Sequence, residues 1–217
     1  MNEKNTHNTD VRTNLCDCII DLEWKQFDKV QNKGGRAACQ DDWKTFFIMR
    51  KSQYMTWTEE LLESYYQDLK DSEARGWNMV AEKYARMMES TAPAEYEQIE
   101  ETLPKRDQAR IQLQEELIRV QVKWAEEFAG EYPGLSGRGR SIHTWEDRED
   151  QTSYETYLRG EMGTYSDRTM QLYEEFVRSL EKKKECLAKK IMENTVKMYG
   201  YKNLEEAEKI FFTKTKE

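Results

Sequence analysis

The sequence predicts an all-α protein, an irregular multi-helix bundle that forms a single domain. Apolar residues recur every three or four positions along most of the 217 residues, which is the period of a helix. Only three prolines and ten glycines occur, and most of them separate the periodic segments. No run of alternating β-branched residues predicts a strand. The apolar stripes shift register between heptads, which favours an irregular bundle over a coiled coil.

The first helices can be placed from their apolar stripes and their caps. Three are expected over residues 9–31, 41–54 and 56–76. The first opens at Thr9 or Asp10, where polar residues precede the apolar stripe. The third opens at Thr56, and Glu59 three residues later completes a capping box.

The middle of the chain alternates between helical segments and one long irregular stretch. Periodic segments are expected over residues 79–90, 93–104 and 111–130. Pro93 suits the first turn of the second of these, and Pro104 ends it. Residues 130–151 have no helical period, and loops this long in compact domains are typically functional or mobile. We therefore interpret residues 130–151 as a candidate lid.

The final third is again helical. Thr152 begins a capping box, and a helix restarts at Ser166 or Asp167 and continues to Gly200. Asn203 caps a short last helix. The expected organisation is one helical domain over residues 9–212, with flexible ends at 1–8 and 213–217.

Composition limits the class of protein. The formal charge is −8 and, apart from a short basic run at Arg138 and Arg140, the chain lacks the basic face that nucleic acid or an anionic membrane surface requires. No apolar run approaches the roughly twenty residues of a membrane span, and the first ten residues have no hydrophobic signal core. Four cysteines in a chain of this length do not make a disulfide framework. We expect a cytoplasmic protein with neither a nucleic-acid nor a membrane partner.

The stretch from Lys33 to Trp57 is the best candidate for a site. Five of its residues follow helical spacings of four, four, three and four and so share one face: they are Asp42, Phe46, Arg50, Gln53 and Trp57. A face that mixes a carboxylate, a guanidinium, an amide and rings indicates a pocket for a polar ligand. The alternative is a buried Asp42–Arg50 pair at a helix junction.

Cys39 lies just before that predicted helix, next to Gln40, which we include in the same pocket. A helix N-terminus favours the thiolate, and Arg36 adds to this effect, so Cys39 is a candidate nucleophile. Asp41 and Asp42 oppose it by raising the thiol pKa. The alternative, a small buried structural residue, is the interpretation that we favour.

Two further groups of polar residues occur. Glu82 and Arg86 are an i,i+4 pair on the polar face of the segment 79–90, which we interpret as solvated unless that face turns inward. The second group is the stretch from Thr152 to Ser166. It contains a second i,i+4 pair, three tyrosines and a glutamate between two glycines: Glu155, Arg159, Tyr154, Tyr157, Tyr165 and Glu161. Glycines permit close approach of a ligand to the backbone, which makes Glu161 the more specific candidate.

Metal chemistry is disfavoured by the residue types. His7 and His143 are the only histidines, and the thiols of Cys16 and Cys18 on a helix point roughly 200° apart. A Mg²⁺ or Mn²⁺ site made of carboxylates alone stays open, from Asp41, Asp42, Glu82 and Glu161. No other cofactor is expected.

Four strings in the chain resemble an uncharacterised bacterial family, domain of unknown function 4125. They are GGRAACQDDWKTFFIMRKSQ, EKYARMMESTAPAEY, TSYETYLRGEMGTYS and YGYKNLEEAE. The similarity extends from about Ile20 to Glu208. It implies one helical domain and a bacterial cytosolic protein. It implies no activity, and no catalytic residue can be carried over from it.

Together these features predict one polar–aromatic pocket for a small polar or anionic metabolite. The ligand-binding candidates are Arg36, Gln40, Arg50, Gln53, Trp57, Glu82, Arg86, Tyr157, Arg159 and Tyr165. The catalytic candidates are Asp42, Glu161 and Cys39. In an enzyme, the arginines at 36 and 50 would clamp an anionic group, and the carboxylates at 42 or 161 would be the general acid or base. The tyrosines at 157 or 165 would donate to developing charge.

The alternative is a non-catalytic accessory module that binds another protein. A catalyst should bring two carboxylates within about 7 Å in a closed cleft, one of them with a raised pKa. An accessory module should instead expose an apolar patch beside rings such as Trp24, Trp77 or Trp145.

Overall fold

The computed structural model describes residues 3–32 and 34–214, and these residues form α-helices, three short 3₁₀ helices and no β-strand. The all-α bundle is confirmed. The helices are α1 (Glu3–Phe27), α2 (Trp43–Tyr54), α3 (Glu59–Ala74), α4 (Met79–Thr91), α5 (Pro93–Tyr96), α6 (Gln108–Glu131), α7 (Pro133–Ser136), α8 (Tyr154–Met162), α9 (Asp167–Lys183), α10 (Leu187–Met198) and α11 (Leu204–Lys214), with η1 (Ala38–Asp41), η2 (Glu100–Thr102) and η3 (Thr144–Glu146). Helix α1 begins at Glu3 rather than at Thr9 or Asp10. Of the expected flexible ends, residues 1–2 and 215–217 lie outside the described residues.

Side-chain caps define most helix starts. In each case a side-chain oxygen accepts a hydrogen bond from the backbone N–H three residues further on. The capping residues are Asp42, Thr58, Asn78, Asp107, Ser153 and Ser166. Two predicted caps, Thr56 and Thr152, are therefore wrong by two residues and one residue. The Thr56 hydroxyl instead donates to the Gln53 carbonyl at 2.6 Å and so closes the end of α2.

The helix predicted from Ser166 to Gly200 is broken in two. Lys184 has φ 57°, in the left-handed region, and its N–H donates to the Glu181 carbonyl at the end of α9. The N–H of Glu185 then donates to the Leu180 carbonyl at 2.9 Å, which completes the turn. Neither glycine nor proline marks this break in the sequence.

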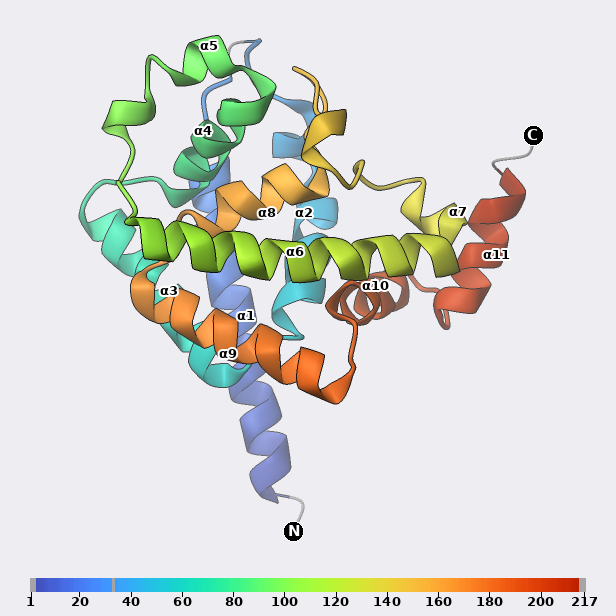
Figure 1. The fold of residues 1–217 in the computed structure, drawn as a ribbon. Coiled ribbons are helices and arrows are strands. Elements are labelled where there is room, and N and C mark those ends of the chain that lie inside the picture. Colours follow the sequence, from blue (N-terminus) through green and yellow to red (C-terminus); the bar gives the residue numbers. More distant parts are fainter. Residues whose placement is uncertain (1–2, 33, 215–217) are drawn as a thin grey trace.

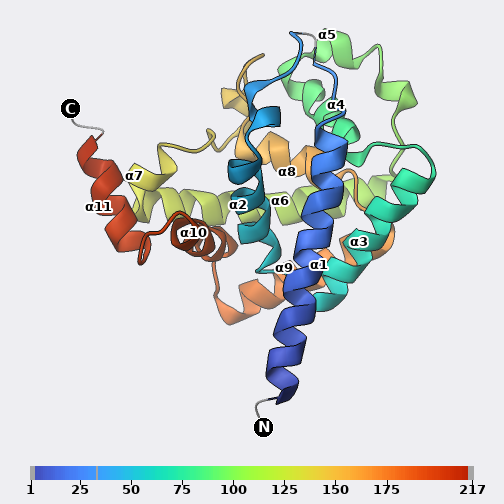
Figure 2. The same cartoon turned by 180° about the vertical axis from the view of Figure 1, so that it is seen from behind.

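The helices pack around two hydrophobic clusters. Figures 1 and 2 show α6 crossing the molecule, from the end where α3 lies to the end where α7 and α11 lie. The main cluster includes Ile20, Trp57, Leu62, Leu117 and Tyr173. The second cluster is smaller and consists of Phe128, Tyr132, Leu135, Val196, Leu204 and Ala207. Helices α6 and α10 contribute to both clusters and so join them.

Close packing of α4 on α8 depends on Gly160. A Cβ placed there would lie 2.7 Å from the Lys83 carbonyl oxygen and 2.7 Å from Met87 Cγ. At Gly163 a Cβ would lie 2.7 Å from Arg86 Cδ. The glycines on either side of Glu161 therefore make room for α4, and not for a ligand at the backbone as the sequence suggested.

The candidate lid is shorter and more structured than predicted. Helix α6 continues to Glu131, and α7 and η3 interrupt the remainder. The Asp147 carboxylate anchors this segment by accepting hydrogen bonds from Ser90 Oγ, Ser153 N and Thr156 Oγ1 at 2.6 Å each. In the part of the chain that the structure describes, no helix combines the length and the apolar character needed to cross a bilayer.

Candidate functional site

The centre of the molecule contains a buried ionic network on Arg50. This side chain projects from α2 and meets Glu23 of α1 through two hydrogen bonds, Nε to Oε2 at 2.8 Å and Nη2 to Oε1 at 2.6 Å. Its Nη1 lies 2.9 Å from Glu161 Oε2 on α8 and 2.9 Å from Gln53 Oε1. Nη2 also donates to Tyr54 Oη. The predicted meeting of Arg50 and Gln53 with Glu161 therefore occurs.

This network changes the interpretation of Arg50. A guanidinium has five N–H donors, and all five donate within the protein. The side chain is 6% exposed. Arg50 has no donor left for an anionic ligand, so the proposed clamp on a ligand must be replaced by a structural ion-pair role.

Glu161 is held as a carboxylate. Its Oε1 accepts from Gln53 Nε2 at 2.9 Å and from Tyr165 Oη at 3.3 Å. Burial acts against the charge, but Arg50, Lys83 and the hydrogen bonds outweigh it, and the pKa of Glu161 is lowered to about 2. A catalytic acid would require a raised pKa, so this carboxylate is poorly suited to give or take a proton near neutral pH.

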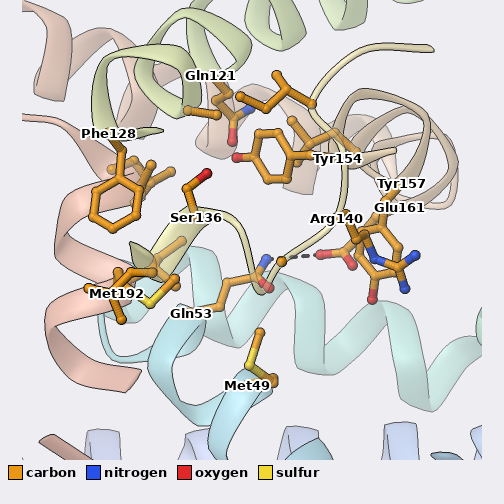
Figure 3. Close-up of a pocket in the computed structure, with 18 of the residues that line it drawn as sticks. Met49, Gln53, Gln121, Phe128, Ser136, Arg140, Tyr154, Tyr157, Glu161 and Met192 are labelled. Carbon is orange, nitrogen blue, oxygen red and sulfur yellow. Dashed lines mark hydrogen bonds between the residues drawn. The ribbon is translucent and has the colours of Figure 1, made fainter. Parts of the chain in front are cut away.

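A cavity of about 400 Å³ opens beside this network and runs between the two hydrophobic clusters. Figure 3 shows Gln53, Glu161, Tyr157 and Arg140 gathered on one side of it. Phe128 and Met192 lie on the opposite side, and Leu135, Leu187 and Ile191 also line the wall. The cavity therefore has a polar end and an apolar end.

Lys83 determines how the hydroxyl of Tyr157 is used at the polar end. Lys83 Nζ lies 2.8 Å from Tyr157 Oη and 3.6 Å from Glu161 Oε2. Burial disfavours the ammonium, but Tyr157 and Glu161 raise the pKa of Lys83 overall, so it stays protonated. An ammonium only donates, so Tyr157 Oη accepts from it and keeps its own proton for another acceptor. No residue in the described part of the chain supplies that acceptor.

Arg140 is the cation at the mouth of the cavity. It is exposed, and its guanidinium carbon lies 4.9 Å from the centre of the Tyr157 ring. Nη1 donates to the Thr152 carbonyl at 3.0 Å. Within the described residues, Arg140 has no carboxylate partner and no second hydrogen bond. Its remaining donors face solvent or the cavity.

Two hydroxyls on the cavity wall also have unused capacity. For the side chains of Tyr154 and Ser136, no hydrogen-bond partner occurs among residues 3–32 and 34–214. Burial, with a contribution from the charge of Glu161, raises the pKa of Tyr154, so its hydroxyl remains a donor. The cavity thus presents donors from Tyr157, Arg140, Tyr154 and Ser136.

Several sequence candidates lie away from this cavity. The Asp42 carboxylate caps α2 by accepting from Thr45 N at 3.0 Å and does not line the cavity. Arg36 is exposed and pairs with Asp28 at 2.7 Å and Asp41 at 2.8 Å. Cys39 is an exposed thiol in η1. These placements remove them from the pocket because each side chain is held in the surface loop before α2.

Gln40 and Trp57 have structural positions. Gln40 is 1% exposed and its Nε2 donates to the carbonyls of Phe27 and Val30, at 2.9 Å and 3.1 Å, which ties the loop to α1. Trp57 lies beyond the end of α2 and packs in the main cluster. Its indole N–H is buried without a hydrogen-bond partner among the described residues. Neither side chain reaches the cavity wall.

The remaining candidates lie at other junctions between helices. Glu82 is 4% exposed and accepts from Trp77 Nε1 at 2.5 Å and from Arg86 Nη2 at 2.7 Å, so the solvated face predicted for α4 is wrong. Arg159 forms a bidentate pair with Glu115 at 2.7 and 2.8 Å. Tyr165 touches Glu161 but is buried behind it.

Sequence reasoning missed the residues that give the cavity its open donors. In the sequence, Arg140 is only part of a short basic run in an irregular segment, and no pattern indicates a role for Ser136. For metals, no group of three or more His, Cys, Asp or Glu side chains converges in the described part of the chain. The four carboxylates considered for Mg²⁺ are divided among η1, the cap of α2, α4 and α8.

These observations define an all-α protein with an amphipathic cavity between its two hydrophobic clusters. A family model described as "Protein of unknown function (DUF4125)" matches residues 13–209, so the chain belongs to this family, as the resemblance implied. Comparison with the curated proteins and with the solved structures gave no match.

Proposed function

We propose that this protein binds a small amphipathic anion in the cavity between its two hydrophobic clusters. The observation that carries the proposal is an imbalance on the cavity wall, where donors from Arg140 and Tyr157 at the polar end, and from Tyr154 and Ser136 elsewhere on the wall, lack acceptors among the described residues. A ligand with an acceptor-rich head would supply them, and its apolar body would lie against Phe128 and its neighbours. A cavity of about 400 Å³ is within the usual range for small-molecule sites.

The distribution of charge supports an anion over a cation. Glu23 and Glu161 are both engaged by Arg50, and Lys83 adds a further positive charge beside Glu161. Arg140 is the charge at the mouth that has no opposite partner among the described residues. A cationic head would have to displace Arg140 or compete with Arg50 for a carboxylate.

Binding is better supported than catalysis. Asp42 is remote from the cavity wall, and the lowered pKa of Glu161 makes it a weak base and no acid near neutral pH. The alternative of an accessory module has one supporting feature, the 78% exposed indole of Trp145, which stacks on His143.

The test is to fill the cavity and measure binding of an amphipathic anion. Ala188 lines the wall, so Ala188→Phe should occupy the space and abolish binding of 1-anilinonaphthalene-8-sulfonate, measured by fluorescence and calorimetry. Ala74→Phe, at an exposed position of α3, is the matched control and should bind like the wild type. Equal binding by both variants would reject the cavity as the site.

The lid hypothesis for residues 130–151 also takes a more specific form. Ser136, Gly139, Arg140 and Ile142 of this segment line the cavity, so we propose that they close over the ligand. The free thiols of Cys16, Cys18, Cys39 and Cys186 support a reducing compartment, and we propose the cytoplasm of a bacterium.

A further inference from the structure

We infer that the ligand is a linear aliphatic monocarboxylate, an unbranched chain that carries one carboxylate head. This inference rests on the proposed function, because it assigns a chemical class to the amphipathic anion of the same cavity. Three features of the cavity carry it: the number of open positive charges, the geometry of the open donors, and the side chains at the apolar end.

At the polar end, one positively charged side chain is without an anionic partner among the described residues. Arg50 is fully engaged, and Lys83 is directed to Tyr157 and Glu161. Arg140 alone among the charged residues that line the cavity has donors without acceptors in the described chain. A dianion such as a phosphate monoester would bring a second negative charge beside the Glu161 carboxylate, with no cation left to balance it. One guanidinium therefore matches one negative charge.

The open donors match the oxygens of a carboxylate. A guanidinium presents parallel N–H groups that fit two carboxylate oxygens, and four of the five N–H groups of Arg140 are unoccupied by described residues. The Tyr157 ring lies under the same guanidinium, and its hydroxyl proton is directed away from Lys83. A single planar head can thus use Arg140 and accept a further hydrogen bond from Tyr157.

The apolar end suits a flexible chain. It is lined by aliphatic and thioether side chains and the ring of Phe128, and Ala125 of α6 and Ala188 of α10 add only small side chains to the wall. Methionine side chains such as Met192 adapt to a chain of changing conformation. Within the lining residues, no charged side chain occurs on the side of Phe128 and Met192 shown in Figure 3.

The experiment is calorimetric titration of the full chain with n-alkanoates of 6 to 14 carbons, each below its micelle concentration. We expect affinity to rise roughly fourfold for each added methylene until the cavity is full, and then to stop rising. Arg140→Gln should weaken binding at least about tenfold, and Tyr157→Phe a few fold. Arg138→Gln is the matched control, because this arginine of the same segment lies over the Phe211 ring and does not line the cavity. It should leave affinity unchanged.

The comparison ligands separate the two claims. n-Alkyl phosphates or bicyclic aromatic acids that bind while n-alkanoates do not would overturn this inference and leave the proposed function in place. Preference for n-alkylamines, or no binding of any amphipathic anion, would overturn both. An n-alkanoate affinity that Arg140→Gln leaves unchanged would place the head group elsewhere and overturn the inference.

Discussion

Arg50 links three helices at the centre of the molecule. It joins α2 to Glu23 of α1 and Glu161 of α8, and the three charged side chains are 2 to 6% exposed. Removing one partner from a buried ion pair is costly because the others remain charged without compensation. Arg50 therefore stabilises the fold, and we propose Arg140 in its place for ligand recognition.

Arg50→Ala should lower the free energy of unfolding by about 3–5 kcal/mol, because Glu23 and Glu161 would be left buried and unpaired. Chemical denaturation with circular dichroism measures the change. Arg178→Ala is the matched control, since that arginine pairs with Glu116 and Glu181 at an exposed site and should lose less than about 1 kcal/mol. Equal losses in the two variants would contradict the structural role of Arg50.

The free energy of unfolding should fall at acidic pH because Glu161 becomes protonated. Its pKa is about 2 in the folded protein, below the ordinary value of 4.5. The stabilisation is therefore complete above about pH 4.5 and disappears as the pH falls towards 2, a contribution of about 3 kcal/mol. Urea unfolding from pH 6 to pH 2.5 should show a smaller decline for Glu161→Gln than for the wild type. Parallel curves would reject this assignment.

The spacing of three residues between Arg50 and Gln53 placed both on one face, and this part of the site was predictable. The pairing with Glu23 was not, because it depends on how α1 lies against α2. Asp42 shares the same helical face in sequence, but it stands at the cap, where its carboxylate turns to the backbone of Thr45. Helical periodicity predicts which residues share a face of the helix, but it does not predict how deeply each side chain is buried.

At the scale of elements, the contact of α4 with α8 is the most constrained. Gly160→Ala should destabilise the protein by several kcal/mol, because the new Cβ would meet the Lys83 carbonyl and Met87 at 2.7 Å. Gly130→Ala is the control, as this glycine in α6 has no atom within 4 Å of the added Cβ. Its free energy of unfolding should rise by about 0.5–1 kcal/mol, because alanine has the higher helix propensity. Thermal unfolding of both variants measures these changes in stability. If Gly160→Ala left the stability unchanged, the close packing of α4 on α8 would be refuted.

The break between α9 and α10 gives a second test at this scale. Lys184 adopts φ 57°, a conformation that costs a side chain about 1–2 kcal/mol. Lys184→Gly should therefore raise the free energy of unfolding by up to about 1 kcal/mol after the entropy of glycine is included. Lys182→Gly, inside α9, should instead lose about 0.5–1 kcal/mol. If both variants were less stable than the wild type, the backbone of Lys184 would not be strained.

Most helices were predictable because their starts carry Asp, Asn, Ser or Thr followed by an apolar stripe. The observed cap differs from the predicted one where two candidate residues lie close together, as Thr56 and Thr58 do. Only the path of the backbone decides which hydroxyl accepts from the first turn of the helix. The stop at Lys184 had no sequence signal. The turn at Lys184 follows from tertiary packing, since α9 packs on α3 and α6 whereas α10 packs on α2 and α6.

At the scale of the whole molecule, the cavity results from the way the two hydrophobic clusters meet. Phe128 and Leu135 belong to the smaller cluster, and Leu158 and Leu187 to the larger one, yet all four line the same space. Glu208 of α11 holds this junction by accepting from the backbone N–H groups of Gly134 and Leu135, at 2.7 and 2.8 Å. The C-terminal helix thus supports one wall of the cavity.

The sequence could identify a pocket near Glu161 but not its extent. The wall combines α2, α6, α7, α8, α9 and α10, which are spread along the chain, and neither composition nor helical period predicts their contacts. Arg140 lies in the stretch where helical periodicity is absent. Its proposed role in ligand binding rests on its position over Tyr157 at the cavity.

The most direct test of the central claim is a methyl NMR spectrum of the protein labelled with ¹³C at its methionine methyl groups and titrated with decanoate. Met49 and Met192 line the cavity, whereas Met55, as exposed as Met49 at 47%, does not. We expect the signals of Met49 and Met192 to shift in a saturable way and that of Met55 to stay in place. Shifts at Met55 without shifts at Met192, or no shift at either cavity residue, would contradict ligand binding in this cavity.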